Sequence, residues 1–288
     1  MASTRQLKSR IRSVRSNRQI TKAMELVAAS KLRRAQDATK ASQDYSMAAR
    51  ELLTQLGQLT DVRRTPFYNI RKVESRLVIL ITSDRGLAGA YNANAIKQLV
   101  ALLEGDRKEK IATKVICIGR RGAQFAARVK DVVIDGVYTN MPEQLTATDI
   151  RPILVNAVGR FLDQEVDEVE VITTRFINSF SQVAETTKLL PAVFETSEVS
   201  HDIQLSEFEP SIDEVLEGAT VRLLEAQLYQ ALLDARASEH SMRRMAMKNA
   251  TDNANELVDD LTLEMNKVRQ SAITQELSEI SGGVEAMK

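Results

Sequence analysis

Apolar and small side chains recur about every 3.5 residues along two long stretches, one near each end of the chain. The first stretch spans residues 7–56 and the second spans residues 212–272. This spacing is typical of helices that wrap around each other as a left-handed coiled coil. We therefore expect two helical arms, residues 1–60 and residues 211–288, that pair with each other.

Proline and glycine are almost missing from both arms, which favours unbroken helices. Residues 2–56 contain neither, and residues 211–281 contain one glycine, Gly218. Because both arms belong to one chain and flank a compact middle, antiparallel pairing is the simplest arrangement. The second arm then extends about 20 residues beyond the first as a single helix. The polar residues that interrupt the apolar seam, and that can fix the register of the pair, are Arg18, His240 and Arg244.

Between the arms, residues 75–205 alternate between strand-like and helix-like patterns. One amphipathic helix is predicted at 146–163, with its apolar residues on one face. Such alternation favours βαβ units. The expected fold class is therefore α/β, with an antiparallel coiled coil joined to a Rossmann-like domain whose sheet is mostly parallel. The expected strands are RLVILIT (76–82), TKVICIG (113–119), DVVIDGV (131–137), VEVITTRF (169–176) and TKLLPAVF (187–194).

Charge is balanced over the whole chain but not along it. The net charge is zero, yet residues 1–40 hold eleven Lys/Arg and two acids, whereas residues 189–221 hold eight acids and no Lys or Arg. This segregation implies partners of opposite charge. The Arg-rich and Ser-rich start is also similar to a mitochondrial presequence, but the helical pattern continues past residue 50, which favours mature structure.

Candidate chemistry is sparse along this chain. A single cysteine, Cys117, excludes an internal disulfide and a cysteine metal cluster, and two histidines argue against a histidine-ligated metal. The best candidate for a ligand site is TSDRGLAGAYN (82–92), which follows a strand and opens a helix. It lacks both glycine-rich nucleotide motifs, so we expect Gly86 and Gly89 to serve turn geometry. We expect no catalytic residue, no cofactor and no metal.

The residues alone leave three classes of function open. The first is a mechanical or scaffold subunit whose helical shaft sits within a larger assembly. The second is a nucleic-acid-binding protein that uses the basic arm, although the aromatic content is 4% and no groove-reading motif is visible. The third is a nucleotide-dependent α/β enzyme, which the weak loop motif disfavours. No apolar run approaches the roughly 20 residues of a membrane helix.

Three segments, found in this order, resemble the γ subunit family of F-type ATP synthases. They are ITKAMELVAASKLRRAQ (20–36), SDRGLAGAYN (83–92) and RQSAITQELSEISGGVEA (269–286). The resemblance covers nearly the whole chain. It departs in small ways at Ala88 and Ala90, where relatives often have Cys and Gly, and at Val284, where they usually have Ala. The dithiol insertion of the chloroplast form is missing, so thiol regulation is not expected.

The resemblance implies a non-catalytic rotor stalk that couples proton flow through a membrane ring to ATP synthesis or hydrolysis on other chains. Its shaft would lie inside a ring of α and β subunits. Its globular base would contact the ε subunit and the membrane c-ring at the cytoplasmic face of a bacterial membrane, without entering the membrane or binding nucleic acid. The partner contacts that it implies are Lys22, Met24, Arg33, Arg34, Arg243, Arg269, Gln270, Thr274 and Glu276 on the shaft, and Phe208 and Glu209 at the base.

Overall fold

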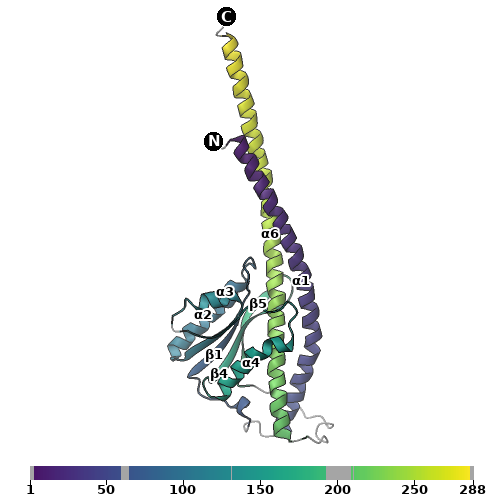
Figure 1. Cartoon of the computed structure of the whole chain (residues 1–288), viewed down its shortest axis with the longest axis vertical. Coiled ribbons are helices and arrows are strands. Elements are labelled where there is room, and N and C mark those ends of the chain that lie inside the picture. Colours follow the sequence, from purple (N-terminus) through teal and green to yellow (C-terminus); the bar gives the residue numbers. More distant parts are fainter. Residues whose placement is uncertain (1–2, 60–64, 131, 193–208, 210, 286–288) are drawn as a thin grey trace. The chain divides into compact units, whose positions relative to one another are not determined.

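The computed structural model describes residues 3–59, 65–130, 132–192, 209 and 211–285. Its two longest elements are the helices α1 and α6, one near each end of the chain (Figure 1). The elements in order are α1 (Thr4–Leu59), η2 (Pro66–Tyr68), β1 (Ser75–Ile81), α2 (Tyr91–Glu109), β2 (Ala112–Ile118), α3 (Arg120–Ala126), β3 (Val133–Tyr138), α4 (Ala147–Leu162), β4 (Glu168–Phe176), β5 (Gln182–Leu190) and α6 (Ile212–Glu285).

Contacts divide the chain into two compact units. The helical unit comprises Met1–Ala29 and Arg243–Lys288, and the mixed unit comprises Ser30–Met242. Both α1 and α6 contribute residues to each unit. The division into segments 1–60, 75–205 and 211–288 that the sequence suggests stays a prediction.

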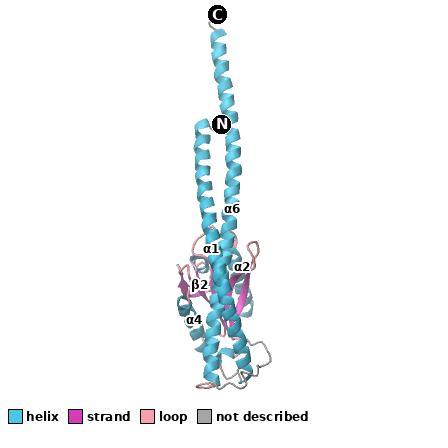
Figure 2. Cartoon of the chain, turned by 90° about the vertical axis from the view of Figure 1, so that its right-hand side faces the viewer, coloured by secondary structure: helices cyan, strands magenta, loops and turns pink. Residues whose placement is uncertain are grey.

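In the helical unit, the start of α1 packs against the far part of α6. Leu7 and Ile11 are buried in one cluster with Val258 and Leu261. Hydrogen bonds join Arg18 to Asn255 and Thr21 to Thr251, so positions in α6 fall as positions in α1 rise. The pairing is therefore antiparallel, as expected, and α6 continues past the start of α1 as a single helix (Figure 2).

The mixed unit is built on a five-stranded sheet with the order β3-β2-β1-β4-β5. β1 pairs in parallel with both β2 and β4, β2 pairs in parallel with β3, and β5 is the one antiparallel strand at its edge. This order confirms the expected Rossmann-like sheet. The chain crosses from one side of β1 to the other between β3 and β4, so the loops after β1 and β4 flank the switch in strand order.

Both faces of the sheet are covered, which explains the unbroken apolar run of β1. Leu77, Ile79 and Ile81 point into a core formed with α4 and α6, whereas Val78 and Leu80 point into a second core formed with α2 and α3. Figure 1 shows these two layers of helices on opposite faces of the sheet. A strand buried on both sides needs apolar residues at successive positions rather than at alternate ones.

The fifth strand was placed wrongly from the sequence. β5 spans Gln182–Leu190, whereas the expected strand spanned residues 187–194, of which 193 and 194 lie outside the described residues. β5 pairs on one side only, with β4, and most of its side chains before Leu189 are exposed or half-buried. An edge strand of this kind keeps polar residues, so the apolar pattern marks only its end.

A buried ionic cluster lies where the sheet meets α2. Arg76 of β1 pairs with Asp106, with Glu168 at 2.8 Å and with Glu170 at 3.6 Å, and Lys188 also pairs with Glu168. The side chains of Asp106 and Glu168 are 4% exposed, so the guanidinium is needed to compensate their buried charge. These residues stabilise the sheet, and none of them was singled out from the sequence.

Among the described helices, none combines the length and the apolar character that crossing a bilayer requires.

Candidate functional site

The last part of α6 presents a long exposed surface among the described residues. Beyond Val268, every described side chain up to residue 281 is exposed. The apolar cluster of the helical unit ends at Val268, and the described side chains beyond it are exposed and available to other molecules. The expected contact residues found on this segment are Arg269, Gln270, Thr274 and Glu276.

One face of this segment is apolar. Ile273, Leu277 and Ile280 are 49%, 61% and 66% exposed. Their spacings of four and three residues place them on the same side of the helix. A row of large apolar side chains in water is costly unless a partner covers it, so this stripe is typical of a protein–protein contact.

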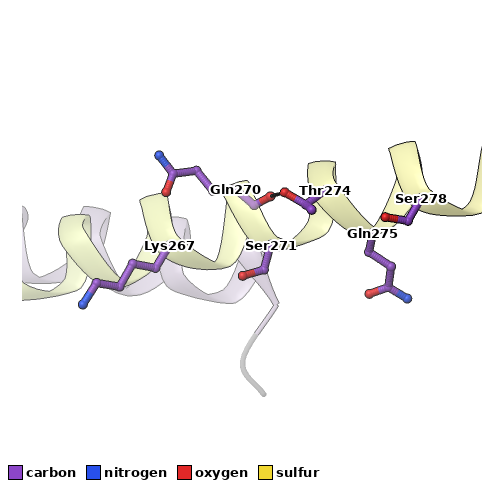
Figure 3. Close-up of a pocket in the computed structure, with 6 residues that line it drawn as sticks. All are labelled: Lys267, Gln270, Ser271, Thr274, Gln275 and Ser278. Carbon is purple, nitrogen blue, oxygen red and sulfur yellow. Dashed lines mark hydrogen bonds between the residues drawn. The ribbon is translucent and has the colours of Figure 1, made fainter.

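A neighbouring face of the same segment is polar and slightly hollowed. Figure 3 shows its side chains, all from α6, and the hydrogen bond that Thr274 Oγ1 donates to the carbonyl oxygen of Gln270 at 3.0 Å. The hollow offers hydrogen-bonding groups and one cation but no paired acid and base, so it suits a contact surface rather than a reaction. The lining residues are Lys267, Gln270, Ser271, Thr274, Gln275 and Ser278.

Three further expected contact residues lie in the helical unit. Lys22 is exposed and forms an ion pair of 3.1 Å with Glu25 on the same helix. Met24 and Arg243 are half-buried. The structure therefore keeps Lys22 at the surface and places Met24 and Arg243 partly within the packing of this unit.

The basic pair Arg33 and Arg34 lies on α1 within the mixed unit. Both side chains are exposed. Arg34 Nη1 lies 3.4 Å from Glu143 Oε1, and Lys31 Nζ lies 2.8 Å from Glu143 Oε2. Part of the basic surface of α1 therefore has an acidic partner within the chain. Glu143 was missed from the sequence, because nothing in its local pattern indicates a contact with α1.

The expected base contact is described in part. Glu209 is exposed, and Phe208 lies outside the described residues. Glu209 therefore offers one carboxylate to the solvent.

The loop after β1 caps a helix with its own atoms. Residues 82–84 accept hydrogen bonds from the first three N–H groups of α3, which have no partner inside the helix. Gly119, just before α3, has φ +95°, and a Cβ there would lie 2.1 Å from the carbonyl oxygen of Thr82. The bonds are Gly122 N–H to Thr82 Oγ1 at 2.8 Å, Arg121 N–H to the Ser83 carbonyl at 3.1 Å and Arg120 N–H to Asp84 Oδ1 at 3.1 Å.

This capping gives the loop a structural role. In nucleotide-binding α/β proteins, a helix N-terminus after a strand holds a phosphate with its free N–H groups. At α3 the first three N–H groups are already satisfied, one of them by the carboxylate of Asp84, whose negative charge would repel a phosphate. Asp84 Oδ2 also accepts the N–H of Asn140 at 2.9 Å, which ties the ends of β1 and β3 together.

Apart from the ionic cluster around Arg76, two buried titratable groups, Cys117 and Asp234, lie in the mixed unit. Burial raises the pKa of the Cys117 thiol to about 11, so it stays protonated and unreactive. Burial also raises the pKa of Asp234 to about 6, against the hydrogen bond donated by Gln230. Within the described part of the chain, no three His, Cys, Asp or Glu side chains gather in a way that would hold a metal ion.

Comparison with known families gives a match over nearly the whole chain. The profile of a family described as ATP synthase matches residues 3–287. The ATP synthase gamma chain of Roseiflexus castenholzii is 41% identical over 292 residues, which cover 100% of this chain and 99% of that protein. The ATP synthase gamma chain of Staphylococcus saprophyticus is 36% identical and is matched over 100% of both proteins.

Solved structures of similar fold come from ATP synthases as well. A chain of the Euglena gracilis mitochondrial ATP synthase, in an OSCP/F1/c-ring structure, has a TM-score of 0.66 at 18% identity and covers 99% of this chain and 94% of that chain. A chain of the Tetrahymena thermophila central stalk/c-ring structure has a TM-score of 0.64 at 21% identity, with 80% and 99% covered. These likenesses concern the fold. Because the curated relatives match end to end at 36% and 41% identity, the chain belongs to the ATP synthase gamma chain family.

Proposed function

We propose that this chain is the central rotor stalk of an F-type ATP synthase, which couples proton flow through a membrane ring to ATP synthesis or hydrolysis. The observation that carries the proposal is the full-length likeness to gamma chains, combined with an antiparallel helix pair that ends in an exposed single helix. An exposed apolar stripe on such a helix marks a surface that a partner can cover.

In this function the chain acts by differential contact and carries no catalytic residue of its own. A ring of α and β subunits would enclose the shaft, and each orientation of an asymmetric shaft favours one conformation of the site that it faces. Rotation then exchanges the conformations among the sites, because a contact shifts an equilibrium only when it binds one state better than another. The chemistry of ATP takes place on the other chains.

The contacts with the ring are assigned to exposed and half-buried residues of the shaft. Two groups support this assignment: the polar and charged side chains near the end of α6, and the basic residues of α1. Negative loops on the ring subunits would complement the basic residues. The proposed shaft contacts are Lys22, Met24, Arg33, Arg34, Arg243, Arg269, Gln270, Thr274 and Glu276.

The base of the stalk is assigned to the ε subunit and the c-ring. Phe208 and Glu209 precede α6, and the exposed carboxylate of Glu209 can pair with a basic or polar loop of a partner. The chain then works at the cytoplasmic face of a bacterial membrane as a peripheral subunit. It needs no cofactor and binds no nucleic acid.

Co-purification tests the proposal. We expect an affinity-tagged full-length chain, expressed in its own host, to elute with a large Mg-ATPase assembly that contains α and β subunits. Elution as a single chain would contradict the rotor function.

Two titrations of the isolated full-length chain separate the other classes of function. With Mg-ATP we expect no saturable heat, and a micromolar dissociation constant would favour a nucleotide-dependent enzyme instead. With plain duplex DNA we expect no strong salt-dependent binding, and tight binding that weakens with salt would favour a nucleic-acid-binding protein.

A further inference from the structure

In the mixed unit, residues 139–146 form the loop between β3 and α4. Side chains of α6 donate hydrogen bonds to main-chain carbonyl groups of this loop. Arg236 Nη1 donates to the carbonyl oxygen of Glu143 at 2.7 Å, and Nη2 donates to that of Met141 at 3.2 Å. The hydroxyl of Tyr229 donates to the carbonyl oxygen of Leu145 at 3.0 Å. Two side chains of α6 therefore bind three carbonyl groups within five residues of the loop.

The same loop is held by α1 through a side chain. The carboxylate of Glu143 is shared by Lys31 Nζ at 2.8 Å and Arg34 Nη1 at 3.4 Å. The hydrogen bond from Lys31 is the main reason that the pKa of Glu143 lies below its usual range. Glu143 thus contacts α6 with its carbonyl oxygen and α1 with its carboxylate.

A third anchor joins the loop to the sheet. The N–H of Asn140 donates to Asp84 Oδ2 at 2.9 Å, and Asp84 Oδ1 caps α3 through Arg120. At the other end of the loop, Thr146 and Asp149 form a capping box that begins α4. The loop is therefore fixed at both ends to elements that pack on the sheet.

A hollow lies between α1, α4 and α6 next to this loop. A cavity of about 590 Å³ separates small residues of α1 from α6 at this level. Ala38 of α1 packs against the core of the mixed unit, so the loop adds a polar connection beside this apolar contact. The lining residues are Ala38, Ala41 and Ser42 of α1, Ala147 of α4, and Arg222, Glu225, Ala226 and Tyr229 of α6.

We propose that the 139–146 loop is a clasp that ties α1 and α6 to the carboxyl edge of the sheet, with Glu143 and Arg236 as its positioning residues. A twist of the helix pair is passed to the sheet through this clasp. The tie follows from the contacts alone, whereas the transmission of twist rests on the proposed rotor function.

The two positioning residues differ in what can replace them. Arg236 is half-buried, and its planar fork reaches two carbonyl groups at once, which a lysine ammonium cannot match. Glu143 sits at the surface, so its role depends on the sign of its charge rather than on burial. A reversal of charge at Glu143, compensated on α1, is therefore the cleanest test.

Hydrogen–deuterium exchange of the isolated full-length chain tests the clasp by itself. We expect Glu143→Lys to raise exchange in residues 31–38 and 139–146 by about tenfold, since opening is local. The charge-swapped Lys31→Glu/Arg34→Glu/Glu143→Lys variant should return it close to wild type. Glu74→Lys, at an exposed ion pair with Lys72, makes the same change elsewhere and should leave both segments unchanged. Unaltered exchange in Glu143→Lys would overturn the clasp.

The assembled complex tests the transmission of twist. In membranes we expect Glu143→Lys to keep ATP hydrolysis and to lower the protons pumped per ATP at least twofold. Pumping should recover in Lys31→Glu/Glu143→Lys, which restores the closer ion pair and leaves the proposed ring contact Arg34 unchanged. Faster hydrogen–deuterium exchange together with unchanged proton pumping would contradict the transmission of twist through the clasp. A chain that enters no ATPase assembly would contradict the proposed function and this transmission with it, while the exchange experiment would still decide the clasp.

Discussion

At the scale of the residue, Asp84 shows how one carboxylate organises an edge of the sheet. Its two oxygens accept N–H groups from Arg120 and Asn140, which follow β2 and β3. We expect Asp84→Ala to lower the free energy of unfolding by about 1–2 kcal/mol, because two backbone donors lose their acceptor. Urea unfolding of the full-length chain measures this change. Asp84→Asn, which keeps one acceptor, should lose less, and equal stability of the Ala variant and the wild type would contradict the capping role.

Asp234 makes the stability of the folded chain depend on pH. Burial raises its pKa from 3.8 to about 6, so the folded state binds a proton more readily than the unfolded state does. Its contribution to stability is therefore fully present below pH 4 and is lost as the pH rises to about 6.

The matching prediction is that Asp234→Asn stabilises the chain at neutral pH. Asparagine has no charge to bury and keeps the oxygen that accepts from Gln230 at 3.3 Å. Discounted for partial solvent access, the gain at pH 8 should be about 1–2 kcal/mol, and it should shrink toward pH 4. Thermal unfolding at the two pH values measures it. A gain that is the same at both would show that the carboxylate does not titrate in this range.

At the scale of the element, a polar layer sits within the helix pair of the helical unit. Thr21 Oγ1 and Thr251 Oγ1 lie 2.8 Å apart, and Arg18 Nη1 donates to Asn255 Oδ1 at 3.2 Å. Apolar packing by Leu7 and its neighbours follows on one side of this layer. Polar groups within an apolar seam favour one register, because a shifted pair would leave them without partners.

We expect the two threonines to be energetically coupled. A double-mutant cycle with Thr21→Val, Thr251→Val and the double variant should give a coupling of about 0.5–1 kcal/mol, since each single change leaves the opposite hydroxyl without its cross-helix partner. Urea unfolding measures the four proteins. Thr262→Val is the control, because its hydroxyl donates to the Val258 carbonyl of its own helix and no cross-helix bond to it is seen among the described residues. Strict additivity of the threonine changes would mean that the layer does not set the register.

At the scale of the whole molecule, Met24 tests the shaft contacts within the proposed function. Met24 and Arg243 are both half-buried in the helical unit. We expect Met24→Lys to impair coupling of proton flow to ATP synthesis while assembly is retained, because it adds a cation to an already basic segment. Val27→Lys adds the same charge at a position that is 55% exposed and should have a smaller effect. The rate of ATP synthesis by inverted membrane vesicles measures both effects. A wild-type rate in Met24→Lys would contradict the assignment of Met24 as a shaft contact.

A substitution at Glu209 tests the proposed contact at the base of the stalk. Charge reversal by Glu209→Lys should leave ATP hydrolysis by the soluble assembly intact and lower ATP-driven proton pumping in membranes, since a basic partner would then meet a like charge. Glu217→Lys, an exposed acid in the first turns of α6, makes the same change without the proposed contact. If pumping and hydrolysis are both unchanged in Glu209→Lys, the acidic residues just before α6 serve only to begin that helix.

Local pattern was enough to predict most elements of this fold. Both arms could be predicted because the apolar spacing of a paired helix repeats within a few residues. The first four strands could be predicted because buried strands contain runs of apolar residues. The edge strand β5 was predicted too far along the chain, because most of its residues are polar and only its end carries apolar residues. The interruption of the seam at Arg18 was also visible, but its partner Asn255 was not.

The sequence by itself determined the helix pair, the class of the sheet and, through three motifs, the family. Only the tertiary structure decided what the polar residues do, because their partners lie far away along the chain. Lys31 and Glu143 are 112 residues apart, and Asp84 and Asn140 are 56 apart. Periodicity reports which face of an element is buried, since burial acts on each side chain separately. A hydrogen bond or ion pair needs two particular atoms within about 3 Å of each other, and that condition is met only once the chain has folded.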